Sequence, residues 1–537
     1  MGELGMQTRG MSGAIGSLLA SVSGRCYRSF SPVSGMAWVV LLALTKMALL
    51  LLATSNSYGY FRDELYFLDA TKHLGWGYVD FPPLVAFIGA AVRAVLGISP
   101  LGLRLLPAIA GALVIVLAGL MAQELGAGRF GQALAALACL LAPMLLAIDS
   151  FFSMNPFDQL WWALLAYLTI RLLRQDRPQL WPLCGAVVGL GLLTKGSILA
   201  WSLALVAGLA LSPARRYLRS RWFWLAGVLA LLIVAPYLFW QSANGWPAVA
   251  FWNGYRQDLL HRSALDFALQ QIVGMNPATA PLSLAGIYFY LISCKGRPHR
   301  ALGWAFVLLY AGLSMASAKG YFLASAYPML FAGGACAFEA ASAKELWRWA
   351  RPAYIGFLVA AGLFLIPVTL PILSPATLAR AYAPAMAYPA IHVENDQTSL
   401  LPEWLAGRLG WQEMVATVGS VYTGLPPDQQ RDACILAGNY GEAGALNLYG
   451  SAYGLPPVIS GHNNYFLWGP GDCTGQVIIA VGMAREKLET VFGTVAEARH
   501  LTCAECMAGE TDLRVYVCLQ PRLPLRQVWP EFKRYGM

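Results

Sequence analysis

Long apolar stretches recur along most of this chain, and they limit the possible folds more than any other feature of the sequence. Hydrophobic residues make up 58% of the 537 residues and charged residues 12%, whereas soluble domains have about 45–50% and about 25%. A single soluble core stops growing at roughly 250–300 residues, so water cannot be the solvent for this much apolar surface. The sequence therefore predicts a mostly helical, polytopic membrane protein.

Eleven stretches are apolar enough to form a transmembrane bundle, although several are shorter than the ideal length of about 20 residues. A further stretch, 84–97, contains Arg93 and follows Pro82 and Pro83, so we expect an interfacial helix in the first outer loop. The expected membrane helices cover residues 36–54, 103–124, 130–148, 158–173, 180–194, 197–212, 222–239, 280–294, 301–317, 322–338 and 352–373.

Positive charges in the connections predict the orientation of the chain. With a cytoplasmic N-terminus, fourteen Lys and Arg residues fall in cytoplasmic connections and six in the opposite ones, as the positive-inside rule requires. The same rule accounts for the net charge of +9, so we expect no nucleic-acid partner. The fourteen are Arg129, Arg171, Arg174, Arg177, Arg215, Arg216, Arg219, Arg221, Lys295, Arg297, Arg300, Lys344, Arg348 and Arg351, and the six are Arg62, Lys72, Lys195, Arg256, Arg262 and Lys319.

Three regions follow from this orientation. Residues 1–35 are rich in Gly and Ser without a sustained apolar run, so we expect a cytoplasmic tail rather than a cleaved signal peptide. Residues 36–373 form the membrane domain, and 374–537, with more acidic residues and Gly-rich turns, form an extracytoplasmic α+β domain. Its expected elements are strands at 476–481 and 513–519 and a helix at 485–492.

Five of the ten cysteines lie in this outer domain, where an oxidising compartment permits disulfides. Because five is odd, at least one thiol should be free. Cys503 and Cys506 have the spacing of half a zinc site, but no second pair accompanies them. We therefore expect a disulfide from Cys518 to one of these two.

Carboxylates mark the first outer loop, where Asp63 and Glu64 are adjacent and Asp80 precedes the Pro-Pro turn. Two interpretations are open. Acidic residues favour the first turn of a helix, where they cap it and interact with its dipole. Carboxylates beside a membrane cavity are also costly to hold, and they are candidates for function.

Further polar residues are expected on the same side of the membrane. Asp158 follows Asn155-Pro156, Lys195 lies in a Thr-Lys-Gly segment, and Lys319 is followed by Gly320 and Tyr321. A lysine at a helix end can simply extend its ammonium group to the headgroups. Two lysines and several carboxylates on one face nevertheless suit a site that binds an anionic phosphate and activates a hydroxyl.

Taken in their order along the chain, these motifs resemble those of bacterial membrane glycosyltransferases of the GT-C fold, related to protein O-mannosyltransferases and the lipid A aminoarabinose transferase. The resemblance covers nearly the whole chain. The matching segments are Phe-Arg-Asp63-Glu64, Asp80-Phe-Pro82-Pro83, Met-Asn155-Pro-Phe-Asp158, Thr194-Lys195-Gly196, Lys319-Gly-Tyr321, Asn439-Tyr-Gly-Glu442 and Gly-His462-Asn463-Asn.

The resemblance implies an inverting sugar transfer from a polyprenyl-phosphate donor to a hydroxyl of a protein, glycan or lipid, outside the bacterial inner membrane. Asp63 would be the general base, with Glu64 holding the site. The aminoarabinose transferase has a phosphate-contacting lysine where this chain has Phe81, so Lys195, Lys319 or Arg256 must take that role. The other implied residues are Asp80, Asp158 and Tyr321 for the donor, and Asn439, Glu442, His462 and Asn463 for an acceptor cleft.

Several alternatives stay open. Asp80 or Asp158 could meet His462 around a divalent metal, although a histidine in such a turn is more often a structural hydrogen-bond partner. The segment from Asn439 to Glu442 lines a cleft or only forms a turn. Two other functions are considered. The first is a transporter or lipid flippase, and the second is a membrane anchor for an outer binding domain. A transporter should have charges near helix centres and paired broken helices, whereas the charges here lie mostly at helix ends.

Overall fold

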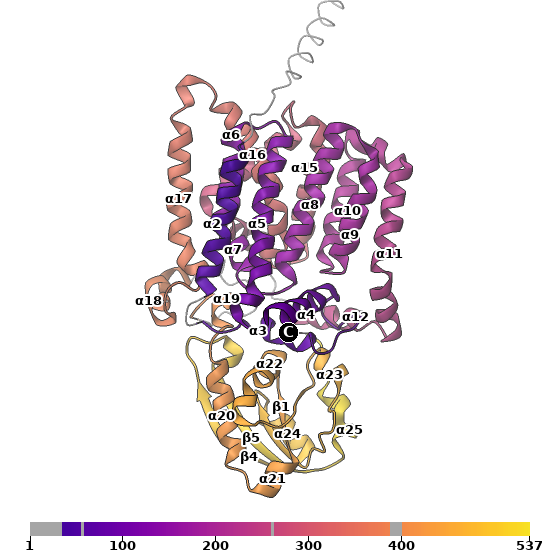
Figure 1. Ribbon diagram of the computed structural model, residues 1–537, viewed down its shortest axis with the longest axis vertical. Helices are drawn as coiled ribbons and strands as arrows, with labels where there is room; N and C mark the ends of the chain where they lie inside the picture. The colour runs from indigo at the N-terminus through magenta and orange to yellow at the C-terminus, as the bar shows by residue number, and fades with distance from the viewer. Residues whose placement is uncertain (1–34, 55–57, 259–262, 387–399, 537) are drawn as a thin grey trace, which may run out of the picture.

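A helical bundle and a smaller domain built around a β-sheet lie end to end, with a layer of short helices between them (Figure 1). The computed structural model describes residues 35–54, 58–258, 263–386 and 400–536. The expected mostly helical membrane fold with a C-terminal α+β domain is confirmed. The predicted N-terminal tail lies, apart from Gly35, outside the described residues.

All eleven predicted apolar stretches are largely helical in the structure. By length and composition, five of the described helices could cross a membrane, or up to seven if each of two bent pairs is one span. The predicted number of eleven spans therefore stays a prediction. The bundle helices are α2 (Met36–Thr54), α5 (Pro100–Glu124), α6 (Arg129–Leu140), α7 (Pro143–Asp149), α8 (Met154–Gln175), α9 (Trp181–Leu192), α10 (Ser197–Ala210), α11 (Arg221–Ala243), α14 (Ala280–Leu291), α15 (Arg300–Met315), α16 (Tyr327–Ala341) and α17 (Ala350–Thr369).

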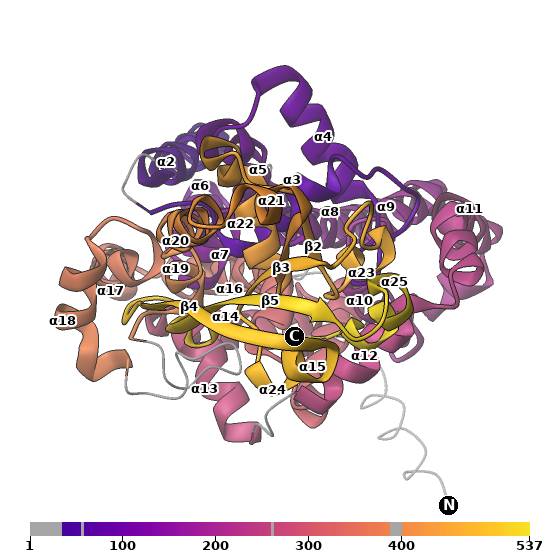
Figure 2. The ribbon, with the colours of Figure 1, turned by 90° about the horizontal axis from the view of Figure 1, so that it is seen from below.

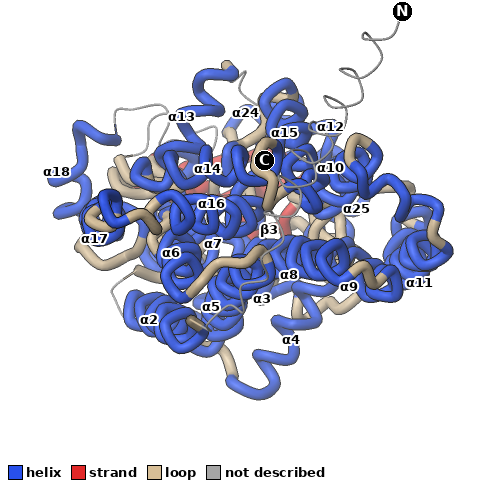
Figure 3. Tube along the Cα trace, turned by 90° about the horizontal axis from the view of Figure 1, so that it is seen from above, coloured by secondary structure: helices blue, strands red, loops and turns tan. Residues whose placement is uncertain are grey.

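Figure 3, seen from above, shows α5, α6, α8 and α16 packed together within the bundle, with α2 at its edge beside α5 and α6. One of the bent pairs, α6 and α7, has an angle of 62° between its helices. Pro143 begins α7, and because proline has no N–H it cannot continue the hydrogen-bond ladder of α6. The bend brings residues 150–152 against the first outer loop.

Short helices form the layer between the two parts. They are α3 (Arg62–Ala70), α4 (Leu84–Leu96), α12 (Pro247–Asp258), α13 (Ala264–Gly274), α18 (Pro375–Met386) and α19 (Glu403–Ala406). At 1.5 Å per residue α4 is only about 20 Å long, well short of the ~30 Å hydrocarbon core. Figure 2 shows α4 extending beyond the side of the bundle, as expected of an interfacial helix.

The outer domain contains a five-stranded sheet in the order β2-β1-β3-β5-β4. Strands β1, β2 and β3 are parallel, while β5 is antiparallel to both β3 and β4. The predicted strands and helix correspond to β3, β5 and α24. The elements are β1 (Ala433–Ala437), β2 (Val458–Ser460), β3 (Val477–Val481), β4 (Phe492–Thr502), β5 (Asp512–Pro521), α20 (Trp411–Thr423), α21 (Pro427–Asp432), α22 (Tyr440–Tyr449), α23 (Asn464–Trp468), α24 (Arg485–Val491) and α25 (Leu525–Val528).

One buried apolar cluster joins the outer domain to the first outer loop. Leu65 and Tyr66 of α3 belong to the same cluster as Ala443 and Leu446 of α22. A Cβ atom at Gly444 would lie 2.8 Å from the backbone carbon of Leu65, so α22 can approach α3 this closely only with glycine at that position. The outer domain is therefore packed directly on the helix that carries Asp63.

The expected disulfide of Cys518 is wrong. The disulfides join Cys434 to Cys473 and Cys503 to Cys506, while Cys518 is a buried free thiol. Cys518 lies opposite Val495 within the sheet, whereas the Cys503 segment follows the far end of β4, where Thr502 pairs with Asp512. Six strand residues separate these two levels, or about 20 Å, which no disulfide can bridge. The expectation of at least one free thiol is confirmed.

Candidate active site

Carboxylates on the membrane side accept hydrogen bonds from the outer domain at three points. The Tyr440 hydroxyl donates to Asp63 and the Tyr465 hydroxyl to Asp69, both on α3. Asn463 and Asn464 donate through their side-chain amides to Asp80, in the loop before α4. The candidate site therefore lies where the two parts of the protein meet, between α3 and α22 in Figure 1.

Asp63 is the accessible carboxylate of the adjacent pair in the first outer loop. Its Oδ1 accepts a hydrogen bond of 2.9 Å from the Tyr440 hydroxyl and lies 3.8 Å from Nε of Arg62. Its side chain is 29% exposed, whereas the Glu64 side chain is fully buried. Arg62 in turn is 5.4 Å from the centre of the Tyr440 ring and pairs with Glu403.

Glu64 is fully buried and acts as an anchor. Arg104 of α5 donates to it through Nε at 2.9 Å and Nη2 at 2.6 Å. The backbone N–H groups of Phe61 and Phe152 donate to it as well, at 2.8 and 2.9 Å. Burial alone would raise the pKa of Glu64, but the charge and hydrogen bonds of Arg104 lower it overall. Glu64 thus stays ionised, and through Phe61 it caps α3, as the capping interpretation proposed.

Asp80 has a different environment. It accepts hydrogen bonds from the Tyr66 hydroxyl at 2.8 Å and from the amides of Asn464 and Asn463 at 3.0 and 3.1 Å. Removal from water raises the pKa of Asp80 to about 7, and the nearby charge of Asp63 adds to this effect. Asp80 can therefore hold a proton near neutral pH.

Asn463 holds its amide against Asp80 with an unusual backbone conformation. Its φ is +47°, in a region that residues other than glycine rarely adopt. The backbone carbonyl of Arg534 accepts its N–H, and its own side-chain oxygen accepts the N–H of Gly536. Such strained residues cluster at functional sites, because the surrounding structure must hold them there.

Apart from Asp80, the predicted donor residues lie in a second region. Lys195 donates to Asn155 at 2.6 Å, and its ammonium group lies 5.0 Å from the centre of the Tyr321 ring. Lys319, which is 1% exposed, lies 5.1 Å from the centre of the Tyr255 ring, next to Arg256 on α12. Arg256 itself is exposed.

Asp158 belongs to the same region and accepts hydrogen bonds from Ser197 and Trp162. The two regions are connected through the backbone, because the N–H of Leu84, after the Pro-Pro turn, donates to the carbonyl of Leu193 at 2.9 Å. Leu193 lies two residues before Lys195.

An apolar cavity of about 310 Å³ lies between α13, α14, α15 and α16. Gln271 in its wall donates to the carbonyl of Gly320 at 2.9 Å, directly after Lys319. The cavity thus adjoins the lysine region. Its lining residues are Ala268, Gln271, Ile272, Met275, Thr279, Ala280, Ser283, Leu284, Ile287, Phe306, Val307, Tyr310, Tyr327 and Leu330.

The predicted residues of the outer domain mostly build its docking surface. Asn439 caps α22 in a reciprocal capping box with Glu442, which is the turn interpretation. Glu442 is buried, and its pKa is raised by burial and by the charge of Glu510. Nδ1 of His462 accepts the N–H of Tyr440 at 3.2 Å, and its Nε2 lies 3.0 Å from the carbonyl of Gly536.

This arrangement does not fit a metal site at Asp80 and His462. Both ring nitrogens of His462 have hydrogen-bond partners, and burial lowers the pKa of His462 to about 3, so the ring is neutral. Both oxygens of Asp80 already accept hydrogen bonds. Among the described residues, no three His, Cys, Asp or Glu side chains form a group that could hold a metal ion.

Sequence reasoning assigned no role to two residues that contact Asp63 and Glu64. Arg104 had a usable signal, because it is an arginine within a 25-residue apolar helix, where a charge needs a partner. Tyr440 lies within the Asn439–Glu442 motif, but nothing in the sequence connects it with Asp63. Only its place on α22 brings it to Asp63.

Comparisons with known proteins support the fold. Residues 80–240 match the family model of dolichyl-phosphate-mannose-protein mannosyltransferases. ArnT from Cupriavidus metallidurans bound to undecaprenyl phosphate has a similar structure, with a TM-score of 0.57, 16% identity, and coverage of 90% of this chain and 98% of that chain. The apo structure of the same ArnT has a TM-score of 0.56 and 15% identity, again with coverage of 90% of this chain and 98% of that chain. No curated protein matches the sequence.

Proposed function

We propose that this chain, a PMT/ArnT-like membrane protein of the GT-C fold, is a glycosyltransferase that takes its sugar from a polyprenyl-phosphate lipid. The family match describes enzymes that use dolichyl-phosphate mannose, and the similar ArnT structure holds undecaprenyl phosphate. The acceptor is a hydroxyl of a protein, glycan or lipid, and the transfer inverts the configuration of the sugar.

The observation that carries this proposal is the combination of a partly exposed carboxylate, two buried lysines and an apolar cavity whose wall is hydrogen-bonded to Gly320, the residue after Lys319. Asp63 removes the proton of the acceptor hydroxyl as its oxygen attacks the anomeric carbon of the sugar. The bond from that carbon to the phosphate oxygen breaks, and the lipid phosphate leaves with its electron pair. Buried cations stabilise the charge that develops on such a leaving group.

Lys195 and Lys319 are the cations that suit the lipid phosphate. Both are nearly buried and lie beside aromatic rings, and Lys319 precedes the segment bonded to the cavity wall. Phe81 stands where the aminoarabinose transferase has its phosphate-contacting lysine. Its uncharged ring packs between Tyr78, Tyr66 and Phe67, so it cannot make that contact with the phosphate. The cavity would then hold part of the polyprenyl chain.

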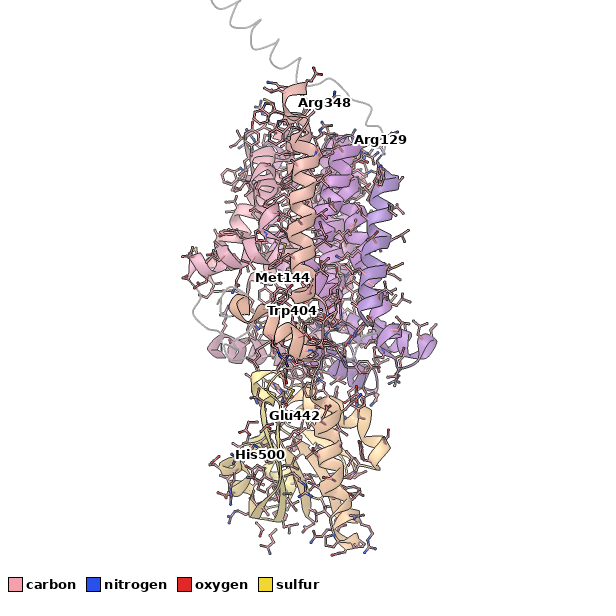
Figure 4. The ribbon with its side chains drawn as sticks, turned by 90° about the vertical axis from the view of Figure 1, so that its left-hand side faces the viewer. Arg129, Met144, Arg348, Trp404, Glu442 and His500 are labelled. Carbon is pink, nitrogen blue, oxygen red and sulfur yellow. A yellow bond between two sulfur atoms is a disulfide. The ribbon has the colours of Figure 1, made fainter. Side chains whose placement is uncertain are left out.

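The site faces the outside of the bacterial inner membrane in this proposal, with the N-terminus in the cytoplasm. Figure 4 supports this orientation. Arg129 and Arg348 lie at one end of the bundle, and the outer domain, in which Glu442 and His500 are labelled, lies at the other. Arginines gather at the cytoplasmic ends of membrane helices.

The test is the transfer of labelled sugar from a panel of polyprenyl-phosphate donors in membranes that contain equal amounts of wild type, Asp63→Asn or Asp176→Asn. Asp176 is a matched control, since it is an exposed aspartate that pairs with Arg216 between α8 and α9. We expect product with wild type and Asp176→Asn, and none with Asp63→Asn. Equal product from all three would remove Asp63 as the base, and no transfer from any donor would contradict the enzyme.

A further inference from the structure

We propose that Tyr440 of the outer domain is a positioning residue for Asp63, so that the active site is complete only when the outer domain is docked on α3. The inference deepens the proposed function, because it takes Asp63 to be the general base. It gives the outer domain a part in the chemistry, beyond any contact with the acceptor.

The surroundings of Tyr440 hold its hydroxyl in place. The ring is stacked on Tyr66 of α3, with 4.7 Å between centroids and 26° between planes. The guanidinium of Arg62 lies over the ring, and the His462 ring is 5.1 Å away. The hydroxyl itself donates to Oδ1 of Asp63 at 2.9 Å.

The backbone of Tyr440 is held as well. Tyr440 is the first residue of α22, directly after the capping residue Asn439, so its N–H has no partner within the helix. His462 supplies that partner through Nδ1, and Nε2–H of the same ring donates to the carbonyl of Gly536. Both motifs of the outer domain, the one with His462 and the one with Asn439, therefore help to position the Tyr440 hydroxyl.

A hydroxyl that donates to a carboxylate fixes the carboxylate plane and favours its ionised form. Among the described residues, the charged and titratable groups seen to interact with Asp63 include Arg62 on its own helix, Tyr440 from α22 and Asp80 from the loop before α4. Arg62 and Tyr440 favour the ionised base, whereas Asp80 opposes it when charged. Removing only the Tyr440 hydroxyl should therefore make Asp63 easier to protonate.

Tyr465 offers a matched control. It also donates its hydroxyl from the outer domain to a carboxylate of α3, but that carboxylate is Asp69. Its ring also stacks on Tyr66, with 5.8 Å between centroids. Tyr465→Phe therefore removes a comparable docking contact and leaves the contact of Tyr440 with Asp63 in place.

The experiment measures kcat and kcat/KM against pH for wild type, Tyr440→Phe, Tyr465→Phe and Asp63→Asn. We expect Tyr440→Phe to lower kcat about tenfold and to move the acidic limb of kcat/KM upward by about 0.5–1 pH unit. Tyr465→Phe should leave the limb where it is. Because the limb position does not depend on the amount of active protein, partial misfolding cannot imitate the result.

The possible results separate the two proposals. An inactive Asp63→Asn with an unmoved limb in Tyr440→Phe would overturn the positioning role and leave the proposed base intact. If Tyr440→Phe and Tyr465→Phe shift the acidic limb of kcat/KM by the same amount, Tyr440 contributes only to docking of the outer domain. An active Asp63→Asn would overturn the proposed base itself.

Discussion

Arg104 and Glu64 form a bidentate ion pair that is almost completely shielded from solvent, with side-chain exposures of 2% and 0%. The pair joins α5 of the bundle to the first turn of α3, where Asp63 precedes Glu64. The position of the proposed base therefore depends on an ion pair beneath it.

Arg104→Met should strongly destabilise the protein. The substitution leaves the Glu64 carboxylate buried without its cation, which typically costs about 3–5 kcal/mol. We expect a clear fall in the melting temperature of the purified protein in detergent. The control is Arg174→Met, since Arg174 is 44% exposed in its pair with Glu124 and such pairs contribute about 0–1 kcal/mol. Equal melting temperatures for the two variants would contradict the anchoring role of Arg104.

Lys195→Met should impair donor use. It removes an ammonium group that is proposed to hold the lipid phosphate, and losing one such contact to developing charge lowers kcat by roughly 10²–10³-fold. Transfer kinetics at varied donor concentration check this result. Lys344→Met, at an exposed lysine before α17, should behave like wild type. Unchanged kinetics in Lys195→Met would exclude Lys195 from the donor site.

Asp80 should make stability depend on pH. Its pKa is raised from 3.8 to about 7 in the folded protein, so the folded state binds more protons than the unfolded state between these values. The free energy of unfolding should then fall as the pH rises from about 4 to about 7, and the Asp80 contribution should level off above that.

Asp80→Asn tests this dependence. Between pH 4.5 and 8 the melting temperature should fall less in the variant than in wild type. The corresponding fall in the free energy of unfolding should be smaller by about 1–3 kcal/mol. Asp176→Asn again serves as the control. Parallel curves for wild type and Asp80→Asn would show that Asp80 has an ordinary pKa.

The two disulfides should differ in their effect on stability. Cys434 and Cys473 are 39 residues apart in sequence, whereas Cys503 and Cys506 are three apart. In the chain-entropy description a longer loop is stabilised more, by about 4 kcal/mol against about 1.5 kcal/mol. The double serine variant of Cys434 and Cys473 should melt at the lower temperature. The reverse order would mean that local packing, rather than loop length, decides the effect.

Sequence reasoning was most successful where one local property decides the structure. The stretch 36–54 was predicted as a helix because its apolar run has the length of a membrane span, and α2 has the same bounds. A strand was predicted at 476–481 from its strand-like run, and β3 lies within these bounds and is buried along its whole length. The Asp63-Glu64 motif likewise located the first turn of α3.

The sequence failed where a pairing depends on distance in three dimensions. Nothing local distinguishes Cys518 as a disulfide partner from Cys473, and the register of β4 on β5 separates it from Cys503. The turn at Asn439 and a structural hydrogen bond of His462 were among the interpretations of the sequence, but only the structure shows that both act on the backbone around Tyr440.

Composition and the lengths of the apolar stretches alone determined that this chain is a helical membrane protein with a C-terminal α+β domain, because lipid demands long apolar helices whatever their partners. Only the tertiary structure decided which carboxylate is buried and which is exposed. Asp63 and Glu64 are neighbours in sequence, but consecutive side chains of a helix diverge by about 100°. Glu64 therefore points to Arg104 inside the protein, and Asp63 points to Tyr440 at the interface with the outer domain.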